Sequence, residues 1–165
     1  MLKKVMLLLF SLILTVSYSF AQSGSLSYNG RTGDKSLDLE LKNLNFSATA
    51  DKDNFIREMS ASYNTSESKI AGLIENDKMN PGDIYLSFEI SRLSKNDPDY
   101  VIREFKNNKR KGWGYIAQQM GIKPGSPEFK ELKNKTKQKN AKMKKHKERG
   151  SDKNKEKGNG KGKNK

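Results

Sequence analysis

The spacing of apolar residues predicts that most of the middle of the chain is helical. From residue 51 onward, apolar residues recur at intervals of three and four, which is the period of a helix with one buried face. The clearest stripes are Phe55, Ile56, Met59 and Tyr63; Ile70, Leu73 and Ile74; and Val101, Ile102 and Phe105. The pattern therefore predicts a row of short amphipathic helices.

The stretch from Lys111 to Leu132, KGWGYIAQQMGIKPGSPEFKEL, carries the sharpest signals. Gly121 stands where a left-handed residue closes the helix that begins near Trp113. Ser126 then offers an N-cap oxygen for a second helix, and a proline follows at the first helical position. We predict a helix, a glycine turn and a second helix, with Trp113 in the core.

Two segments show the alternation of a strand. Leu37, Leu39 and Leu41 alternate with polar residues, which is typical of a half-buried strand. A lone hairpin is marginal in water, so this segment must lie on the helices or form no sheet at all. The segment from Ile84 to Leu93 also alternates, but an asparagine and a proline before it mark a helix start, and helix is our prediction.

The first 21 residues are typical of a cleaved secretory signal. Lys3 and Lys4 precede an apolar run from Val5 to about Val16, and Ala21 ends a cleavage site of small residues. The run is shorter than the roughly 20 residues that a bilayer span needs, and no later segment approaches it. We therefore expect a secreted or periplasmic protein with no integral membrane span after the signal is cleaved.

Charge separates the middle of the chain from its end. Residues 22–132 hold 16 Lys and Arg and 16 Asp and Glu, whereas residues 133–165 hold 15 basic and 3 acidic residues, a net charge of +12. Ala141 and Met143 are the only aliphatic side chains in that last segment. It therefore lacks the apolar surface that offsets the loss of chain entropy on folding, and we expect it to be disordered.

These boundaries give the predicted architecture. The parts are a signal peptide at 1–21, a flexible leader at 22–35, a small helical domain at 36–132 and a disordered Lys-rich tail at 133–165. The predicted fold class is mainly α, a small bundle of five or six short helices with disordered termini, and a short β strand or hairpin before the helices is one option. A single domain of this size has a modest core.

The middle of the chain also resembles a known family. The segments LDLELKNLN, DKDNFIREMSASYN, NPGDIYLSFEISRLS and KGWGYIAQQMGIKPGSPEFKELK are similar to a family of small secreted bacterial proteins of unknown function. The similarity spans about Thr32 to Lys133, and its most specific part is the GWGxIAxxxGIKPGSxEF motif from Gly112 to Phe129. Members of the family often end in Lys- and Gly-rich tails. The resemblance implies secretion and a helical fold, and it implies no activity, ligand or catalytic residue.

Few residues suited to catalysis or metal binding are present. The chain has no cysteine and one histidine, His146, which lies in the Lys-rich segment. The predicted domain therefore lacks the residues of a Ser-His-Asp or Cys-His site and of a His/Cys metal site. We predict no enzyme, no cofactor and no metal. Hydrolysis by paired carboxylates is the enzymatic alternative.

The cationic segment is the candidate binding site. Lysine charge attracts anions without selecting among them, so acidic polysaccharide, anionic lipid head groups and nucleic acid are all candidate partners. The residues expected to bind are Lys133, Lys135, Lys137, Lys139, Lys142, Lys144, Lys145, Lys147 and Arg149. The predicted function is an exported, non-enzymatic interaction protein whose helical domain displays a cationic tail to polyanions at the cell envelope. A solubilising tail without a partner is the simpler alternative.

A helix-turn-helix nucleic-acid-binding module is the second function that the pattern allows. Such a module places the second of two helices in the major groove of DNA, and residues 111–132 have the required helix, turn and helix. Glu128 and Glu131 argue against it, because carboxylates on the recognition helix repel phosphate. The same pattern is also a general way to pack two short helices.

Overall fold

The part of the chain that the structure describes is built from helices alone. The structure is a computed structural model that describes residues 27–158, with side chains described for residues 27–146. The helices of this part are α3 (Lys35–Ala50), α4 (Lys52–Tyr63), α5 (Glu67–Glu75), α6 (Pro81–Ser94), α7 (Pro98–Asn108), α8 (Trp113–Gln119) and α9 (Pro127–Gly158). The prediction of a mainly α fold is confirmed. The predicted signal peptide, residues 1–21, lies outside the described residues.

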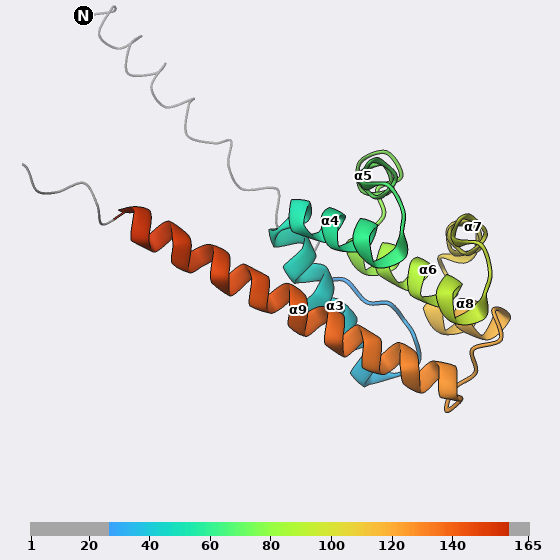
Figure 1. The fold of residues 1–165 in the computed structure, drawn as a ribbon. Helices are drawn as coiled ribbons and strands as arrows, with labels where there is room; N and C mark the ends of the chain where they lie inside the picture. Colours follow the sequence, from blue (N-terminus) through green and yellow to red (C-terminus); the bar gives the residue numbers. More distant parts are fainter. Residues whose placement is uncertain (1–26, 159–165) are drawn as a thin grey trace, which may run out of the picture.

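Helix α6 lies at the centre of the fold (Figure 1). It contacts α3, α4, α5, α7 and α9, and every residue from Pro81 to Ser91 is buried. A helix that is covered on all sides has no polar face, so its sequence loses the period of 3.6 residues. This explains why Ile84 to Ile90 alternates like a strand, and the prediction of helix for this segment is confirmed.

The predicted strand around Leu37 to Leu41 is wrong, because this segment belongs to helix α3. Asp34 caps the helix, and its carboxylate accepts the backbone N–H of Leu37 at 2.9 Å. Leu37 and Leu41 are four residues apart and face the core, whereas Leu39 is 58% exposed. Two leucines four residues apart fit the period of a helix and that of a strand. The exposed Leu39 between them made the three residues look like the alternation of a strand.

Residues 27–34 of the predicted flexible leader pack on the domain instead. The Trp113 backbone N–H donates to the Gly30 carbonyl at 3.0 Å, and the Gly114 N–H donates to the Arg31 carbonyl at 3.1 Å. Gly114 has no space for a side chain, because a Cβ there would overlap a carbonyl oxygen of the leader. The prediction of flexibility is therefore wrong for these residues. Their Ser- and Gly-rich composition suggested flexibility, but composition cannot show that the backbone has hydrogen-bond partners elsewhere in the chain.

The buried carboxylate of Asp83, near the start of α6, joins the leader to α8. Its Oδ1 accepts the Tyr28 hydroxyl at 3.0 Å and the Trp113 indole N–H at 2.8 Å. Its Oδ2 accepts the side-chain amide of Asn80 at 3.1 Å. Burial raises the pKa of Tyr28, which keeps that hydroxyl a proton donor. Three donors from three segments therefore compensate the burial of one carboxylate.

The stretch from Lys111 to Leu132 folds as predicted. Trp113 is 2% exposed, and its ring stacks on Phe105 with centroids 4.5 Å apart. Gly121 has a φ of 84°, and the N–H of the following Ile122 donates back to a carbonyl of α8 at 2.8 Å. This geometry is the glycine helix end that the sequence indicates. The helix, the turn, the second helix and the core position of Trp113 are all confirmed.

Trp113→Ala should lower the free energy of unfolding by about 3–5 kcal/mol, the usual range for deleting a core aromatic residue. The variant loses the stack on Phe105 and one donor to Asp83. Chemical denaturation followed by far-UV circular dichroism measures the change. The control is Leu39→Ala at an exposed position, which should change stability by less than about 0.5 kcal/mol. An unfolding midpoint of Trp113→Ala equal to that of the control would contradict the core assignment.

Candidate functional site

The predicted binding residues lie on helix α9, which continues well beyond the predicted end of the domain. The helix runs from Pro127 to Gly158 and lies along α3 (Figure 1). Ser126 caps it, because its Oγ accepts the backbone N–H of Phe129 at 3.1 Å. The prediction of a disordered tail from residue 133 is therefore wrong for the described residues, which are helical.

A strip of buried side chains at intervals of three and four holds α9 on the domain. Its members, each at most 9% exposed, are Phe129, Leu132, Thr136, Lys139 and Met143. The Thr136 hydroxyl is satisfied within the helix, since it donates to the Leu132 carbonyl at 2.8 Å. Two of the five side chains are polar, which is why a search for apolar residues misses the strip.

Ion pairs reinforce this contact. Lys133 Nζ lies 2.7 Å from Asp34 Oδ2, and Lys139 and Lys142 place their Nζ atoms 3.4 Å and 2.8 Å from Glu58 Oε2. Burial lowers the pKa of Lys139. Burial acts to raise the pKa of Glu58, but the two lysines outweigh it and the pKa lies below its ordinary value. Three of the predicted polyanion-binding lysines are therefore engaged in holding the fold together.

The outer face of α9 carries cations in a row. Lys130, Lys137 and Lys144 are exposed and seven residues apart, so they lie on one line along the helix, about 10 Å from one to the next. Among residues 27–146, no acidic side chain is within ion-pair distance of these three. We call them the outer lysine row. Lys145, also exposed, follows its last member.

The remaining predicted residues occupy other positions on α9. Lys135 lines a cleft on a different side of the helix. Lys147 and Arg149 belong to α9, but their side chains lie outside the described ones. The structure thus places some of the predicted lysines in ion pairs with the domain, some on the outer face and some at a cleft, and Lys139 and Lys142 belong to both the first and the third group. Only Lys130, in the outer lysine row, was missing from the prediction, because it lies before the boundary at residue 133.

The cleft, which the sequence did not indicate, lies between α4, α6 and α9 and has a volume of about 340 Å³. Its lining is polar. The ionisable residues among its lining are Glu58, Tyr63, Tyr85, Glu89, Arg92, Lys135, Lys139 and Lys142. No single element carries more than a few of them, so their juxtaposition requires the packing of all three helices.

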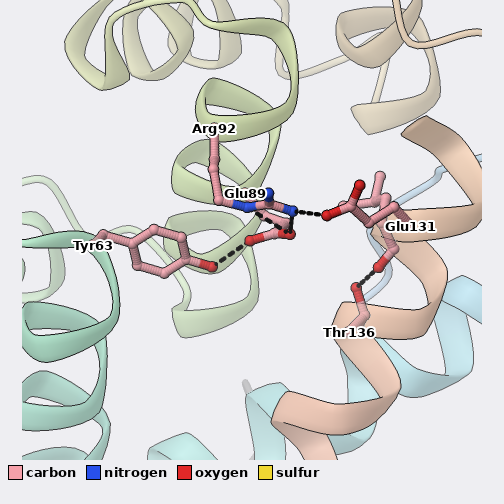
Figure 2. A network of polar contacts seen from close by, with 6 residues as sticks. Tyr63, Glu89, Arg92, Glu131 and Thr136 are labelled. Atoms are coloured by element: carbon pink, nitrogen blue, oxygen red, sulfur yellow. Dashed lines mark hydrogen bonds and ion pairs between the residues drawn. The ribbon is translucent and has the colours of Figure 1, made fainter. Parts of the chain in front are cut away.

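A network around the buried Glu89 forms one wall of the cleft (Figure 2). The Tyr63 hydroxyl donates to Glu89 Oε2 at 2.7 Å, and Arg92 donates to Oε1 from Nη2 at 2.6 Å and from Nε at 3.2 Å. The same Nη2 donates to Glu131 Oε1 of α9 at 2.6 Å. Both oxygens of Glu89 are therefore occupied, and the network ties α4, α6 and α9 together.

The same contacts bear on the helix-turn-helix alternative. A recognition helix must leave the residues of its first turns available to bases. Glu131, in the second turn of α9, is paired with Arg92, and Glu128 is exposed in the first turn. An exposed carboxylate at that position repels the phosphate backbone. The geometry of α8 and α9 therefore supports packing better than DNA reading.

Other kinds of site and known relatives offer no further guide. In residues 27–146, no group of acidic, histidine or cysteine side chains is placed to hold a metal ion. None of the helices in residues 27–158 is long and apolar enough to cross a membrane. Comparisons with family models, curated proteins and solved structures found no match to this chain. The resemblance of residues 32–133 to secreted bacterial proteins stays a prediction.

Two truncations should separate the docked part of α9 from the rest of the chain's end. Removing residues 133–165 deletes Thr136, Lys139 and Met143, and should lower the free energy of unfolding by more than about 2 kcal/mol, the lower end for losing one large buried side chain. Removing residues 147–165 spares the buried strip and should change the free energy of unfolding by less than about 0.5 kcal/mol. Thermal unfolding followed by circular dichroism compares the two. Equal free energies of unfolding for the two truncated proteins would show that the docked part of α9 does not stabilise the domain.

Acid should weaken the docking of α9. The hydrogen bond from Lys133 lowers the pKa of Asp34, and the pKa of Glu58 is also lowered. A carboxylate with a depressed folded-state pKa stabilises the fold above its unfolded value, here about 3.8 and 4.5, and this contribution is lost as the pH falls through the folded-state pKa.

Stability should therefore be lower at pH 3 than at pH 7. Denaturation at the two pH values measures the drop, and the double variant Asp34→Asn with Glu58→Gln should show a smaller one. Asparagine preserves the helix cap at position 34. A variant whose stability changes with pH as much as that of the unmodified protein would exclude these two carboxylates as the cause.

Proposed function

We propose that the protein is an exported, non-enzymatic interaction protein that binds polyanions at the cell envelope through the outer face of α9. The observation that carries the proposal is the outer lysine row, three exposed cations in line on a helix that is docked on the domain. The proposal of export rests on the pattern of residues 1–21. A mature protein whose N-terminal residue is Gln22 would demonstrate that the signal is cleaved.

A regular row of cations suits a partner with repeated negative charge. Acidic polysaccharide, a surface of anionic lipid head groups and nucleic acid all have such a repeat. Each lysine that engages a phosphate releases condensed counterions, which is a source of affinity that does not depend on sequence. Because helix α9 already holds these lysines in place, binding orders less of the chain than binding by a disordered tail would.

The rest of the protein contributes little net charge to such a contact. Residues 22–132 contain equal numbers of basic and acidic residues, whereas residues 133–165 carry a net charge of +12. Three of the lysines in that segment are already paired, Lys133 with Asp34 before α3 and both Lys139 and Lys142 with Glu58 of α4. The outer lysine row is therefore among the cations of residues 27–146 that have no acidic partner and are available to a polyanion.

Replacing the outer lysine row should weaken polyanion binding and its dependence on salt. In the triple variant Lys130→Gln, Lys137→Gln and Lys144→Gln, the slope of log affinity against log salt for a short DNA duplex should fall in magnitude by up to about 3, one for each lost phosphate contact. Fluorescence anisotropy of a labelled duplex between roughly 50 and 200 mM salt measures it. Glutamine is a good helix former and should leave α9 intact.

The control variant removes the same charge from other exposed positions, Lys42→Gln on α3 and Lys78→Gln and Lys123→Gln in loops. It should bind as the unmodified protein does. Equal losses in the two triple variants would show that total charge matters and the outer lysine row does not. Duplexes of different sequence should bind alike, and a strong preference for one of them would favour the helix-turn-helix alternative instead.

A further inference from the structure

The cleft between α4, α6 and α9 contains a buried hydroxyl that has no partner. Tyr85 of α6 is 1% exposed and lines the cleft, and its hydroxyl makes no hydrogen bond to any group in the described part of the chain. Thr136 lies beside it and donates its own proton to the Leu132 carbonyl, but the Thr136 oxygen is not placed to accept the Tyr85 proton with hydrogen-bond geometry. Burial raises the pKa of Tyr85, so its hydroxyl keeps a proton to donate. An unpartnered buried donor costs stability, which calls for an explanation.

The other polar groups of the cleft leave an excess of donors. Both oxygens of Glu89 are occupied by Tyr63 and Arg92, and Glu58 is shared by two lysines of α9. Lys135 has no acidic partner among residues 27–146. Four cationic side chains line the cleft against two carboxylates, and a third carboxylate, Glu131, pairs with Arg92 from beside it, which leaves one cation in excess. The group that would complete this arrangement is a hydrogen-bond acceptor with negative charge.

We infer that this cleft binds a small organic oxyanion, a molecule with a carboxylate or phosphate group on a polar body. The oxyanion would accept hydrogen bonds from Lys135 and Tyr85, while Ser62 and Gln138 line the space around the body. The volume of about 340 Å³ falls in the range of ligand pockets and exceeds what one oxyanion fills. This inference goes beyond the proposed function, which uses a different face of α9.

The first test is a titration of the full chain by isothermal calorimetry at constant ionic strength. The probes are inorganic phosphate, glucose 6-phosphate and gluconate, with glucose as the uncharged control. Glucose 6-phosphate or gluconate should bind and glucose should not, and the tighter of the two identifies the preferred oxyanion. If none of the three anions binds, the inference is overturned.

The second test uses two variants of the cleft. Lys135→Gln and Tyr85→Phe should each weaken binding of the better probe at least tenfold, which is about the effect of losing one hydrogen bond to a charged group. Tyr85→Phe should also raise the melting temperature without ligand, because it removes the unpartnered hydroxyl. A tyrosine with a merely structural role would not combine a gain in stability with a loss of affinity.

The matched control is Lys130→Gln, which removes the same charge from the outer lysine row and should leave probe affinity unchanged. Equal losses for Lys130→Gln and Lys135→Gln, or full affinity in Tyr85→Phe, would overturn the inference. The two proposals fail separately. Tyr85→Phe should bind the DNA duplex normally, and the triple variant of the outer lysine row should bind the probe normally.

Discussion

The hydrogen bonds to the buried carboxylate of Asp83 are the interaction on which the arrangement of the leader, α6 and α8 depends. A carboxylate removed from water is tolerated only where donors replace its hydration, and here they come from Tyr28, Asn80 and Trp113. The carboxylate thereby fixes the leader across the start of α8. Gly114 follows from this, because the leader backbone passes where a side chain would stand. The conspicuous Trp–Gly pattern is thus a packing motif with a partner far away in the chain.

Helix α9 carries its contacts with the domain and its unpaired lysines on separate faces. One face carries the buried strip, one flank pairs with acids of the domain, and the outer face presents lysines to solvent. The lysines of the three faces respond differently to salt, because ions screen exposed charges far more than buried ones. High salt should therefore release a polyanion from the outer lysine row before it loosens the pair between the buried Lys139 and Glu58.

The sequence predicted where positive charge gathers in the chain, but not how the lysines are arranged. The positive charge of residues 133–165 pointed to α9, but composition could not show that Lys139 is buried or that Lys133 pairs with Asp34. Thr136 and Lys139 occupy positions of the strip where apolar residues are expected, and only contact with the domain makes them core residues. The cleft was invisible in the sequence, because Tyr63, Tyr85 and Lys135 belong to three helices that are distant along the chain.

The sequence by itself determined the local features of this protein. Caps and helix ends depend on residues a few positions apart, so the turn at Gly121, the cap at Ser126 and the helices between residues 51 and 132 could all be predicted. Tertiary structure decided everything that needs a distant partner. It made a helix of Leu37 to Leu41, bound the leader to Trp113 and docked α9, because hydrogen bonds and burial between remote segments leave no periodic trace in either segment alone.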